Sequence, residues 1–531
     1  MKILIDNKEV EATPDMNIIQ AAKTVGIDIP AMCYREGLDH FTSCMICVVK
    51  DKTTGRVLPA CSAKVAEGME IETESKEIAE NRKSTLELLL SEHVGDCEAP
   101  CQRVCPVSMD IPRMIREIMD EQPKEAITTV RREMAIPSIL ERFCNAPCEN
   151  GCRRGKYDEG ISIRHLARYS SDEDIQSGIP YIPPCAPPTG KKIAIVGAGV
   201  TGLSALNYLL VEGHDCTLYE TDTKPGGRLH TEFSDVELED WVVKGELDIL
   251  TAMGATFHWG KTLGVELSLP QLKEEYDAVV LAIGAKSLED LEAMGLAVTK
   301  KGLKINPKTY MTGTKGIFAG GSVVKGGQPV IKSATMGKEM AACAHQHATG
   351  LPITGVYEMF NFSMGKLLEG EVDTFIEYSN PIPRVAPDGL EQRGYKKEEA
   401  EEESSRCLHC DCREVNNCKL RIYSDKYGVN QRKFKGEERD NFVHVNQDAG
   451  AVYEPGKCIK CGLCVRVTKD EGEEFGFTFV GRGFDLKTAV PLDKTLKDGL
   501  QHVAELVIEA CPTGALADNE KLKRMPKFME V

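Results

Sequence analysis

Grouped cysteines are the feature of this sequence that most directly predicts chemistry. The chain has 21 cysteines in 531 residues, and most of them stand in tight groups. Grouped thiolates bind metals or iron–sulfur clusters, whereas disulfides are typical of secreted chains. The first group, spaced C-x10-C-x2-C-x13-C, consists of Cys33, Cys44, Cys47 and Cys61. A close pair with two outlying thiolates predicts the four ligands of a [2Fe–2S] cluster, with zinc or free buried thiols as alternatives.

Two more groups lie toward the carboxyl end. The last group, spaced C-x2-C-x2-C-x46-C and followed by proline, consists of Cys458, Cys461, Cys464 and Cys511. Three thiolates on one loop with a distant Cys-Pro predict a [4Fe–4S] cluster, whereas zinc sites more usually show two C-x2-C pairs. The group before it, with enough thiols for another such cluster, consists of Cys407, Cys410, Cys412 and Cys418.

Six cysteines in the middle of the chain form two runs. The first run consists of Cys97, Cys101 and Cys105, and the second of Cys144, Cys148 and Cys152. Proline follows Cys105, as in ferredoxin-type runs. Six thiols cannot fill two four-iron clusters by themselves, so this pattern requires ligands of another type.

A glycine-rich stretch predicts a bound dinucleotide. The segment KKIAIVGAGVTGLSALNYLLVEGHDCTLYE has an apolar strand, the fingerprint glycines, a helix and a second strand ending at Glu220. The glycines Gly197, Gly199 and Gly202 permit a tight turn, a close approach of the pyrophosphate, and close packing of helix on strand. The helix amino terminus favours the pyrophosphate charge, and Glu220 is expected to bind a ribose.

The elements that must position these groups suggest a multidomain chain of α/β and α+β classes. The expected segments are a small sheet with one helix (1–80), a helical cysteine domain (81–178), a Pro-rich linker (179–190), a βαβ domain (191–350), a connector (351–404) and a carboxy-terminal cysteine domain (405–531). The alternating start MKILIDNKEVEA predicts a strand and hairpin instead of a signal peptide, so a cytoplasmic location is expected. A formal charge of −17 argues against nucleic-acid binding, and no membrane span is predicted.

The two ends of the chain resemble the large iron–sulfur subunit of complex I and of the multisubunit iron-only hydrogenases. The resemblance rests on IDIPAMCYREGL, SCMICVV and LPACSAKVAEGMEIET at one end and on the last two cysteine groups at the other. It implies a β-grasp [2Fe–2S] domain and a carboxy-terminal ferredoxin-like [4Fe–4S] module. That family also uses a His after its ferredoxin domain, which makes His93 a candidate ligand.

The middle of the chain resembles the glutamate synthase small subunit, the large subunit of NADH-dependent ferredoxin:NADP oxidoreductase, and dihydropyrimidine dehydrogenase. The resemblance implies one cluster on Cys97, Cys101 and Cys152 and another on Cys105, Cys144 and Cys148. It also implies FAD, whose loops KPGGRL, AVVLAIGA and GIFAGGSV would supply Gly226, Gly227, Arg228, Leu229, Gly284, Gly320, Gly321 and Ser322.

This sequence departs from that family at three positions. The first Cys of the family is missing ahead of Cys97, where His93 stands instead. The family's Gln or Glu ligand falls at Ala167, which cannot bind iron, so that cluster borrows a ligand, has an open iron site, or is absent. Cys185 and His165 are the possible donors considered. Ser322 replaces the usual Asp of the flavin site.

Two further cysteines, Cys216 and Cys343, are expected to be ordinary buried thiols.

A pyridine-nucleotide domain is missing between LAIGAK and GIFAGG. A dinucleotide unit needs about 30 residues for its fingerprint alone, and no G-x-G-x-x-G occurs in the gap. These features predict an electron relay of a larger complex, with a flavin, one [2Fe–2S] and three to four [4Fe–4S] clusters. The expected partners are ferredoxin and a NADH-dehydrogenase-like flavin subunit, together with a hydrogenase or formate dehydrogenase. The assembly is expected to be anaerobic, with electron bifurcation as one candidate activity. An NADPH-dependent enzyme and a scaffold with a decayed flavin site are the alternatives.

Overall fold

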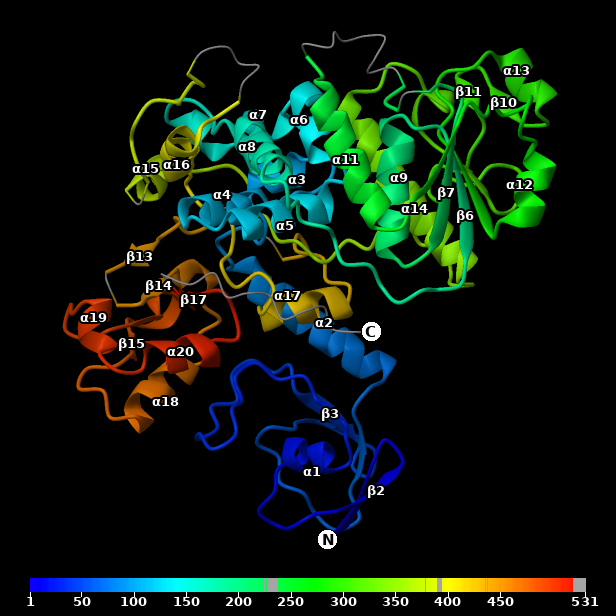
Figure 1. Ribbon diagram of the computed structural model, residues 1–531. Helices are drawn as coiled ribbons and strands as arrows, with labels where there is room; N and C mark the ends of the chain where they lie inside the picture. Colours follow the sequence, from blue (N-terminus) through cyan, green and yellow to red (C-terminus); the bar gives the residue numbers. More distant parts are fainter. Residues whose placement is uncertain are drawn as a thin grey trace. The chain divides into compact units, whose positions relative to one another are not determined.

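The computed structural model describes residues 1–223, 225–227, 237–377, 379–388, 394–434, 436, 438–447 and 449–518 (Figure 1). The chain forms two compact units, each built from discontinuous segments. The first unit comprises residues 1–99, 359–378 and 410–531, and the second comprises residues 100–358 and 379–409.

The amino-terminal part of the first unit is a five-stranded mixed sheet with strand order β2-β1-β5-β3-β4. Its strands are β1 (Lys2–Ile5), β2 (Lys8–Glu11), β3 (Val48–Asp51), β4 (Arg56–Pro59) and β5 (Glu70–Glu72). β1 pairs parallel with β5 and antiparallel with β2. Helix α1 (Ile18–Thr24) begins with a capping box at Asn17 and Gln20, and its apolar face completes the core under this sheet.

Helix α2 (Lys76–Ser91) leads out of this sheet, and its side chain Arg82 is fully buried. Arg82 donates hydrogen bonds to the carbonyls of Ile46, Val48 and Thr73 and to the hydroxyl of Tyr427. A buried guanidinium is tolerated only when its donors are satisfied. Arg82 therefore ties the sheet to α17 (Lys419–Lys426) within the first unit.

The carboxy-terminal part of the first unit consists of short elements around the last cysteine group. Its strands are β13 (Val445–Asn446), β14 (Ala451–Tyr453), β15 (Thr478–Val480), β16 (Lys487–Ala489) and β17 (Leu516–Asp518). Its helices are α18 (Leu463–Asp470), α19 (Leu496–Gly499) and α20 (Ala504–Ala510), and α15 (Glu371–Ile376) also belongs to this unit. β14 is the middle strand of a three-stranded antiparallel sheet.

The second unit begins with a group of short helices. They are α3 (Pro100–Val104), α4 (Ile111–Met119), α5 (Pro123–Glu133), α6 (Pro137–Phe143), α7 (Pro147–Asn150) and α8 (Ile163–Gln176), joined later by α16 (Lys397–Ser405). Proline at the first helical turn starts α4, α5, α6 and α7, where its missing N–H costs no hydrogen bond.

The rest of the second unit is a five-stranded parallel sheet with order β12-β9-β6-β7-β8. The strands are β6 (Lys192–Val196), β7 (Asp215–Glu220), β8 (Thr256–Trp259), β9 (Ala278–Leu281) and β12 (Ile317–Ala319). The flanking helices are α9 (Val200–Val211), α11 (Asp240–Ala252), α12 (Leu269–Glu275), α13 (Leu288–Ala293) and α14 (Val330–Ala348). α9 and α14 pack together on one side of β6 and β7 (Figure 1). This is the nucleotide-binding arrangement that the glycine fingerprint predicts.

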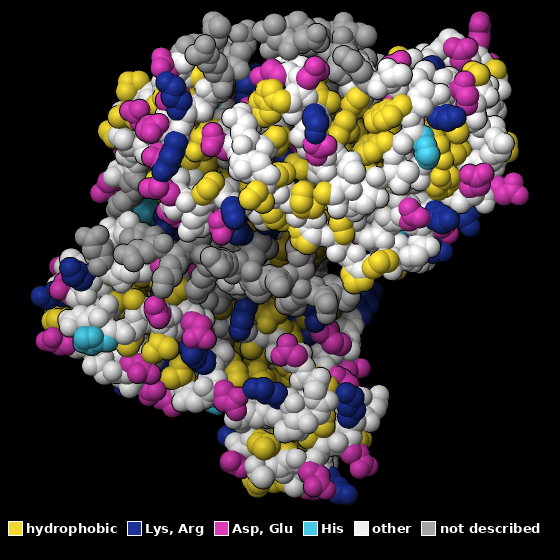
Figure 2. Space-filling view, in the orientation of Figure 1, with side chains coloured by type: hydrophobic (Ala, Val, Ile, Leu, Met, Phe, Trp, Pro, Cys, Tyr) yellow, Lys and Arg dark blue, Asp and Glu magenta, His cyan; other side chains and the backbone are white. Residues whose placement is uncertain are grey.

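The segment between β9 and β12 contains one helix, α13, and a two-stranded hairpin of β10 (Val298–Thr299) and β11 (Gly302–Leu303). Residues 282–316 are all described, and they form no second nucleotide-binding sheet. No other helix or strand is assigned within this described segment. Among the described helices, none is long and apolar enough to cross a membrane. On the face drawn in Figure 2, acidic and basic side chains are intermixed.

Candidate functional sites

The first cysteine group comes together as predicted. The four side chains are almost completely buried, with exposed fractions between 1% and 2% for Cys33, Cys44, Cys47 and Cys61. Cys44 and Cys61 are the leading influences that lower the pKa of the Cys33 thiol, and Cys61 likewise lowers the pKa of Cys47. Four neighbouring buried thiols are the donor set that a [2Fe–2S] cluster requires.

The last cysteine group lines one small cavity. Its walls include all four thiols, the Tyr453 ring and Thr513. Thr513 Oγ1 donates to the Lys457 carbonyl at 3.0 Å, which fixes the loop after Cys511 against the loop before Cys458. Burial raises the pKa of the Cys461 thiol to about 12, so without a cluster this thiol stays protonated. The cavity can therefore hold the cluster predicted from the spacing.

A further set of four candidate ligands was predicted as individual residues but not as one group. His93, Cys97, Cys412 and Cys418 line a single small cavity in the first unit, together with Phe362 and Arg421. The backbone amide of Phe362 donates to Cys97 Sγ at 3.4 Å. The amide of Cys412 donates to the Cys97 carbonyl at 3.0 Å. One imidazole and three thiols around a common volume form a complete set of four cluster ligands.

His93 is held in the form that can bind iron. Burial, together with the charge of the Lys457 ammonium, lowers its pKa to about 3, so the ring is neutral at physiological pH. Its Nδ1 atom has no hydrogen-bond partner among the described residues, and its ring packs edge-on against Phe362. A neutral ring with a free nitrogen is what metal ligation by His needs.

This grouping differs from both cluster assignments made from the sequence. Cys97 was expected with Cys101 and Cys152, and Cys412 was expected with Cys407. In the structure Cys101, Cys152 and Cys407 belong to the second unit, whereas Cys97, Cys410, Cys412 and Cys418 belong to the first. Spacing within one sequence segment could not reveal this group, because a long insertion separates Cys97 from Cys412.

The ligand loops of the first unit are linked to one another. Arg466 Nη2 donates to the carbonyl of Cys33 at 3.0 Å and to the carbonyl of Cys461 at 3.1 Å. A cavity of about 340 Å³ is lined by Cys44, His93 and Cys458, one residue from each of the three ligand groups. Within the described residues, no three His, Cys, Asp or Glu side chains converge to hold a single metal ion.

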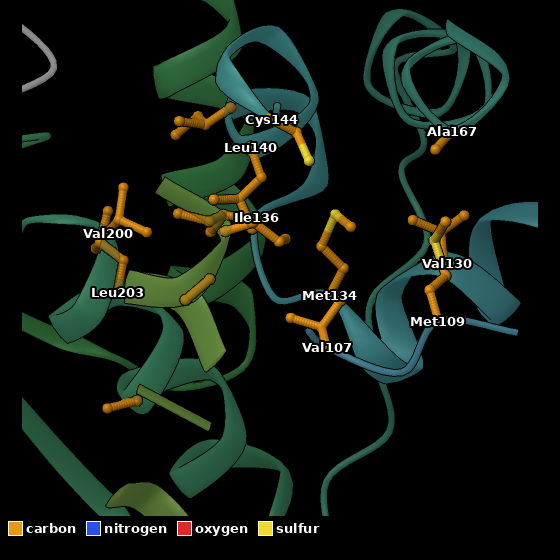
Figure 3. Packing of buried hydrophobic residues seen from close by; sticks show 14 of the residues in the cluster. Val107, Met109, Val130, Met134, Ile136, Leu140, Cys144, Ala167, Val200 and Leu203 are labelled. Atoms are coloured by element: carbon orange, nitrogen blue, oxygen red, sulfur yellow. The ribbon is translucent and has the colours of Figure 1, made fainter. Parts of the chain in front are cut away.

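The second unit contains another set of thiols. Cys105, Cys144 and Cys148 are buried in its core, and each of the latter two thiols is affected electrostatically by Cys105. Helix α3, just before Cys105, packs against α7, which contains Cys148. Cys144 follows the last residue of α6, and Figure 3 shows it beside Leu140 of that helix. Cys101, Cys152 and Cys407 pack on the same core.

The nucleotide cavity lies at the carboxyl ends of the parallel strands and has a volume of about 570 Å³. The predicted residues on its wall are Gly197, Gly199, Glu220, Gly226, Gly227, Gly284, Gly321 and Ser322. Gly202 and Gly320 support the cavity from outside this wall. Arg228 and Leu229 lie outside the described residues. Ser322 thus takes the wall position of the expected Asp, in the 3-10 turn Gly321–Val323.

Two fingerprint glycines have different physical roles. A Cβ atom on Gly202 would lie 1.8 Å from the Gly197 carbonyl oxygen, so only glycine permits this contact between helix and turn. A Cβ atom on Gly199 would meet no protein atom within 4 Å. The space next to Gly199 is where the fingerprint places a pyrophosphate.

Glu220 ends β7 and is 8% exposed. Its carboxylate accepts hydrogen bonds from the amides of Ala198 at 2.5 Å and Asp222 at 3.1 Å. Because one oxygen is bonded to the fingerprint turn, Glu220 fixes the shape of that turn as well as lining the cavity. This second role was not predicted.

Other candidate residues take no part in these sites. Cys185 is exposed, and its thiol contacts the carbonyls of Pro183 and Met253. Cys216 and Cys343 are fully buried in the core, in agreement with their predicted role. His165 is buried and its ring packs against Tyr395.

Three protein-family models match the chain. They are the 2Fe-2S iron-sulfur cluster binding domain over residues 1–76, dihydropyrimidine dehydrogenase domain II with its 4Fe-4S cluster over residues 72–179, and the pyridine nucleotide-disulphide oxidoreductase over residues 159–347. These matches confirm the predicted two-iron and four-iron clusters and the flavin-type nucleotide domain. The protein is therefore an oxidoreductase component with a multidomain α/β fold.

Curated relatives agree with this result. The chain is 33% identical over 225 residues to the NADP(+)-dependent formate dehydrogenase subunit beta of Moorella thermoacetica, covering 38% of this chain and 31% of that one. It is 33% identical to the NADPH-Fe(3+) oxidoreductase subunit beta of Geobacter sulfurreducens (44% and 36%), and 31% identical to the glutamate synthase [NADPH] small chain of Bacillus subtilis (39% and 43%). The matched region spans less than half the length of each of these relatives. The last match confirms the predicted resemblance to the glutamate synthase small subunit.

Proposed function

We propose that this protein is the flavin- and iron–sulfur-containing electron-transfer subunit of a cytoplasmic multisubunit oxidoreductase. The observation that carries the proposal concerns Cys144. Its two neighbours in the chain, Phe143 and Asn145, line the nucleotide cavity. A cluster ligand therefore sits in the loop that bounds the flavin site. A flavin takes up two electrons and releases them singly, and an adjacent cluster accepts one at a time.

The ligand groups support five clusters. In the first unit these are a [2Fe–2S] cluster on the first cysteine group, a [4Fe–4S] cluster on His93, Cys97, Cys412 and Cys418, and another on the last group. In the second unit, one [4Fe–4S] cluster uses Cys105, Cys144 and Cys148, and one uses Cys101, Cys152 and Cys407. Cys410 remains a candidate ligand predicted from the sequence.

The domain scheme follows the resemblances. We infer that residues 1–80 form a β-grasp domain, supported by the mixed sheet over α1. Residues 81–178 are a helical double-cluster domain, and 191–350 an FAD domain without its inserted NAD(P) domain, reached through the linker 179–190. Residues 351–404 are a connector, and 405–531 form a ferredoxin-like module.

The partners are inferred from the chemistry that this chain lacks. Since residues 282–316 hold no second nucleotide-binding sheet, hydride exchange with NAD(P)H falls to another subunit. The names of the relatives, subunits of a formate dehydrogenase and of an NADPH-Fe(3+) oxidoreductase, support such an assembly. Ferredoxin, hydrogen or formate would be the other redox partner, and electron bifurcation at a flavin is compatible with this composition.

Counting cofactors after anaerobic purification with the native partners tests the proposal. We expect one FAD and about 18 irons per chain, the sum for one two-iron and four four-iron clusters. About 14 irons would remove one four-iron cluster from the scheme. Protein without FAD would favour the scaffold alternative and contradict the relay.

A further inference from the structure

The cluster site of Cys105, Cys144 and Cys148 lacks an obvious fourth ligand. A four-iron cube binds one ligand at each iron, and this site has three thiols. The position from which a fourth ligand was expected carries Ala167, which is fully buried on α8 and has only a methyl group to offer. Figure 3 shows Ala167 on α8 and Cys144 on a separate segment of this core, next to Leu140 of α6.

Glu141 is an acid buried in the same place. It lies on α6, three residues before Cys144, which follows the helix in extended conformation. Its side chain is 4% exposed, and Cys144 is 6% exposed. No described residue donates a hydrogen bond to its carboxylate. Burial is the largest influence on its pKa, which it raises, and the charges of Arg164 and Glu149 follow. A buried, unpaired carboxylate is strongly unfavourable unless something binds it.

The carboxylate also lies near all three thiols. Burial raises the pKa of Cys105, Cys144 and Cys148, and the Glu141 carboxylate raises it further in each case. The segments around α3, α6 and α7 thus place one carboxylate near enough to three thiols to interact with each of them electrostatically. Carboxylate oxygen is a normal iron ligand, so the set is chemically sufficient.

We propose that Glu141 is the fourth ligand of the [4Fe–4S] cluster bound by Cys105, Cys144 and Cys148. The inference rests on the proposed function, because it requires a cluster at these thiols. It makes one iron of this cluster oxygen-ligated and places that cluster beside the loop that lines the flavin cavity.

His165 and Cys185, the other candidates for the fourth ligand of this cluster, have less suitable surroundings. His165 packs its ring on Tyr395. The Cys185 thiol is exposed and contacts the carbonyls of Pro183 and Met253. Glu141 is among the leading influences on the pKa of Cys105, Cys144 and Cys148. Neither His165 nor Cys185 is among these influences.

The test compares E141A, E141C and the matched control E117Q in the anaerobically purified full chain. Glu117 is also a buried acid of the second unit, but it is paired with Arg113 at 2.8 Å, and no cysteine is among the leading influences on its pKa. We expect E141A to lose about one iron per chain and to show a three-iron EPR signal after mild oxidation, since one corner of the cube lacks a ligand. E141C should restore the iron, with a shifted EPR spectrum, and E117Q should match the wild type.

Two outcomes distinguish a wrong assignment of Glu141 as ligand from the absence of the cluster itself. If C144A removes a four-iron signal while E141A keeps full iron and an unchanged spectrum, Glu141 is not a ligand, and the relay stands. If C144A changes no signal, the cluster is absent and the proposed function fails at this site. Unchanged FAD content and unchanged signals of the first unit in E141A show that the variant is folded, so its iron loss can be attributed to the ligand.

Discussion

The backbone amide of Cys412 donates a hydrogen bond to the carbonyl of Cys97 at 3.0 Å. Most of the second unit lies between these two residues in the sequence, yet both line the same small cavity with His93 and Cys418. The second unit is therefore an insertion that interrupts a ligand set of the first. A cluster at this site would join the two parts of the first unit that the insertion separates in the sequence.

His93 gives the first prediction. We expect H93A to lose one four-iron EPR signal and up to about four irons per chain, because the remaining three thiols leave one iron without a ligand. H93C should keep the irons with an altered spectrum. The check is anaerobic EPR with an iron assay, and the control is H40A, since His40 lies outside this cavity and its ring stacks on Tyr34. An unchanged spectrum in H93A would show that His93 only packs against Phe362.

Arg466 gives the second prediction. Its guanidinium joins the loops of Cys33 and Cys461, so R466A removes these two charge-assisted hydrogen bonds as well as those to the carbonyls of Asp39 and Gly462. We expect a loss of about 2 to 4 kcal/mol in unfolding free energy and a weaker magnetic interaction between the two clusters. Denaturant unfolding and EPR of the fully reduced protein measure these effects. R432A is the control, because the Arg432 side chain is exposed in the same unit. Equal spectra for R466A and wild type would mean that the loops keep their spacing without Arg466.

The fingerprint glycines give a paired prediction. G199A should leave the apoprotein as stable as the wild type but reduce FAD binding, because the added methyl enters the space of the pyrophosphate. G202A should destabilise the domain itself, because its methyl collides with the Gly197 carbonyl. Thermal unfolding with and without added FAD distinguishes the two variants. Equal FAD affinity in G199A and wild type would contradict the assignment of this cavity.

Acid stability gives a fourth prediction. Glu371 is 2% exposed, and although burial by itself raises its pKa, hydrogen bonds from Arg439 and from the amides of Phe442 and Leu368 lower it to about 2. A lowered folded-state pKa stabilises the fold above the unfolded value, and that stability is lost as pH falls through the folded value. We therefore expect up to about 3 kcal/mol to disappear between pH 5 and 2.

The measurement is the free energy of unfolding as a function of pH, for wild type and E371Q. The variant should be less stable near neutral pH and should show a flatter acid limb. An identical acid limb in both proteins would mean that Glu371 does not contribute to the pH dependence.

The sequence predicted what is local and missed what the fold assembles from distant parts. The first and last cysteine groups and the fingerprint glycines were found because each lies within one motif, where spacing alone specifies geometry. The link between Cys97 and Cys412 was not found, since an insertion hides it from any spacing rule. Glu141 belongs to no motif, and only its burial beside three thiols identifies it. The absence of an inserted pyridine-nucleotide domain stays a prediction, which rests on the short length of the segment between β9 and β12.

The central claim is that the flavin exchanges electrons through clusters and not with a pyridine nucleotide bound by this chain. The most direct test is anaerobic rapid mixing of the purified holoprotein with NADPH or NADH while flavin absorbance is recorded. We predict no bleaching by either nucleotide, and prompt reduction by reduced ferredoxin or a low-potential chemical reductant that enters through the clusters. Rapid bleaching by NADPH alone would contradict the claim and favour an NADPH-dependent enzyme.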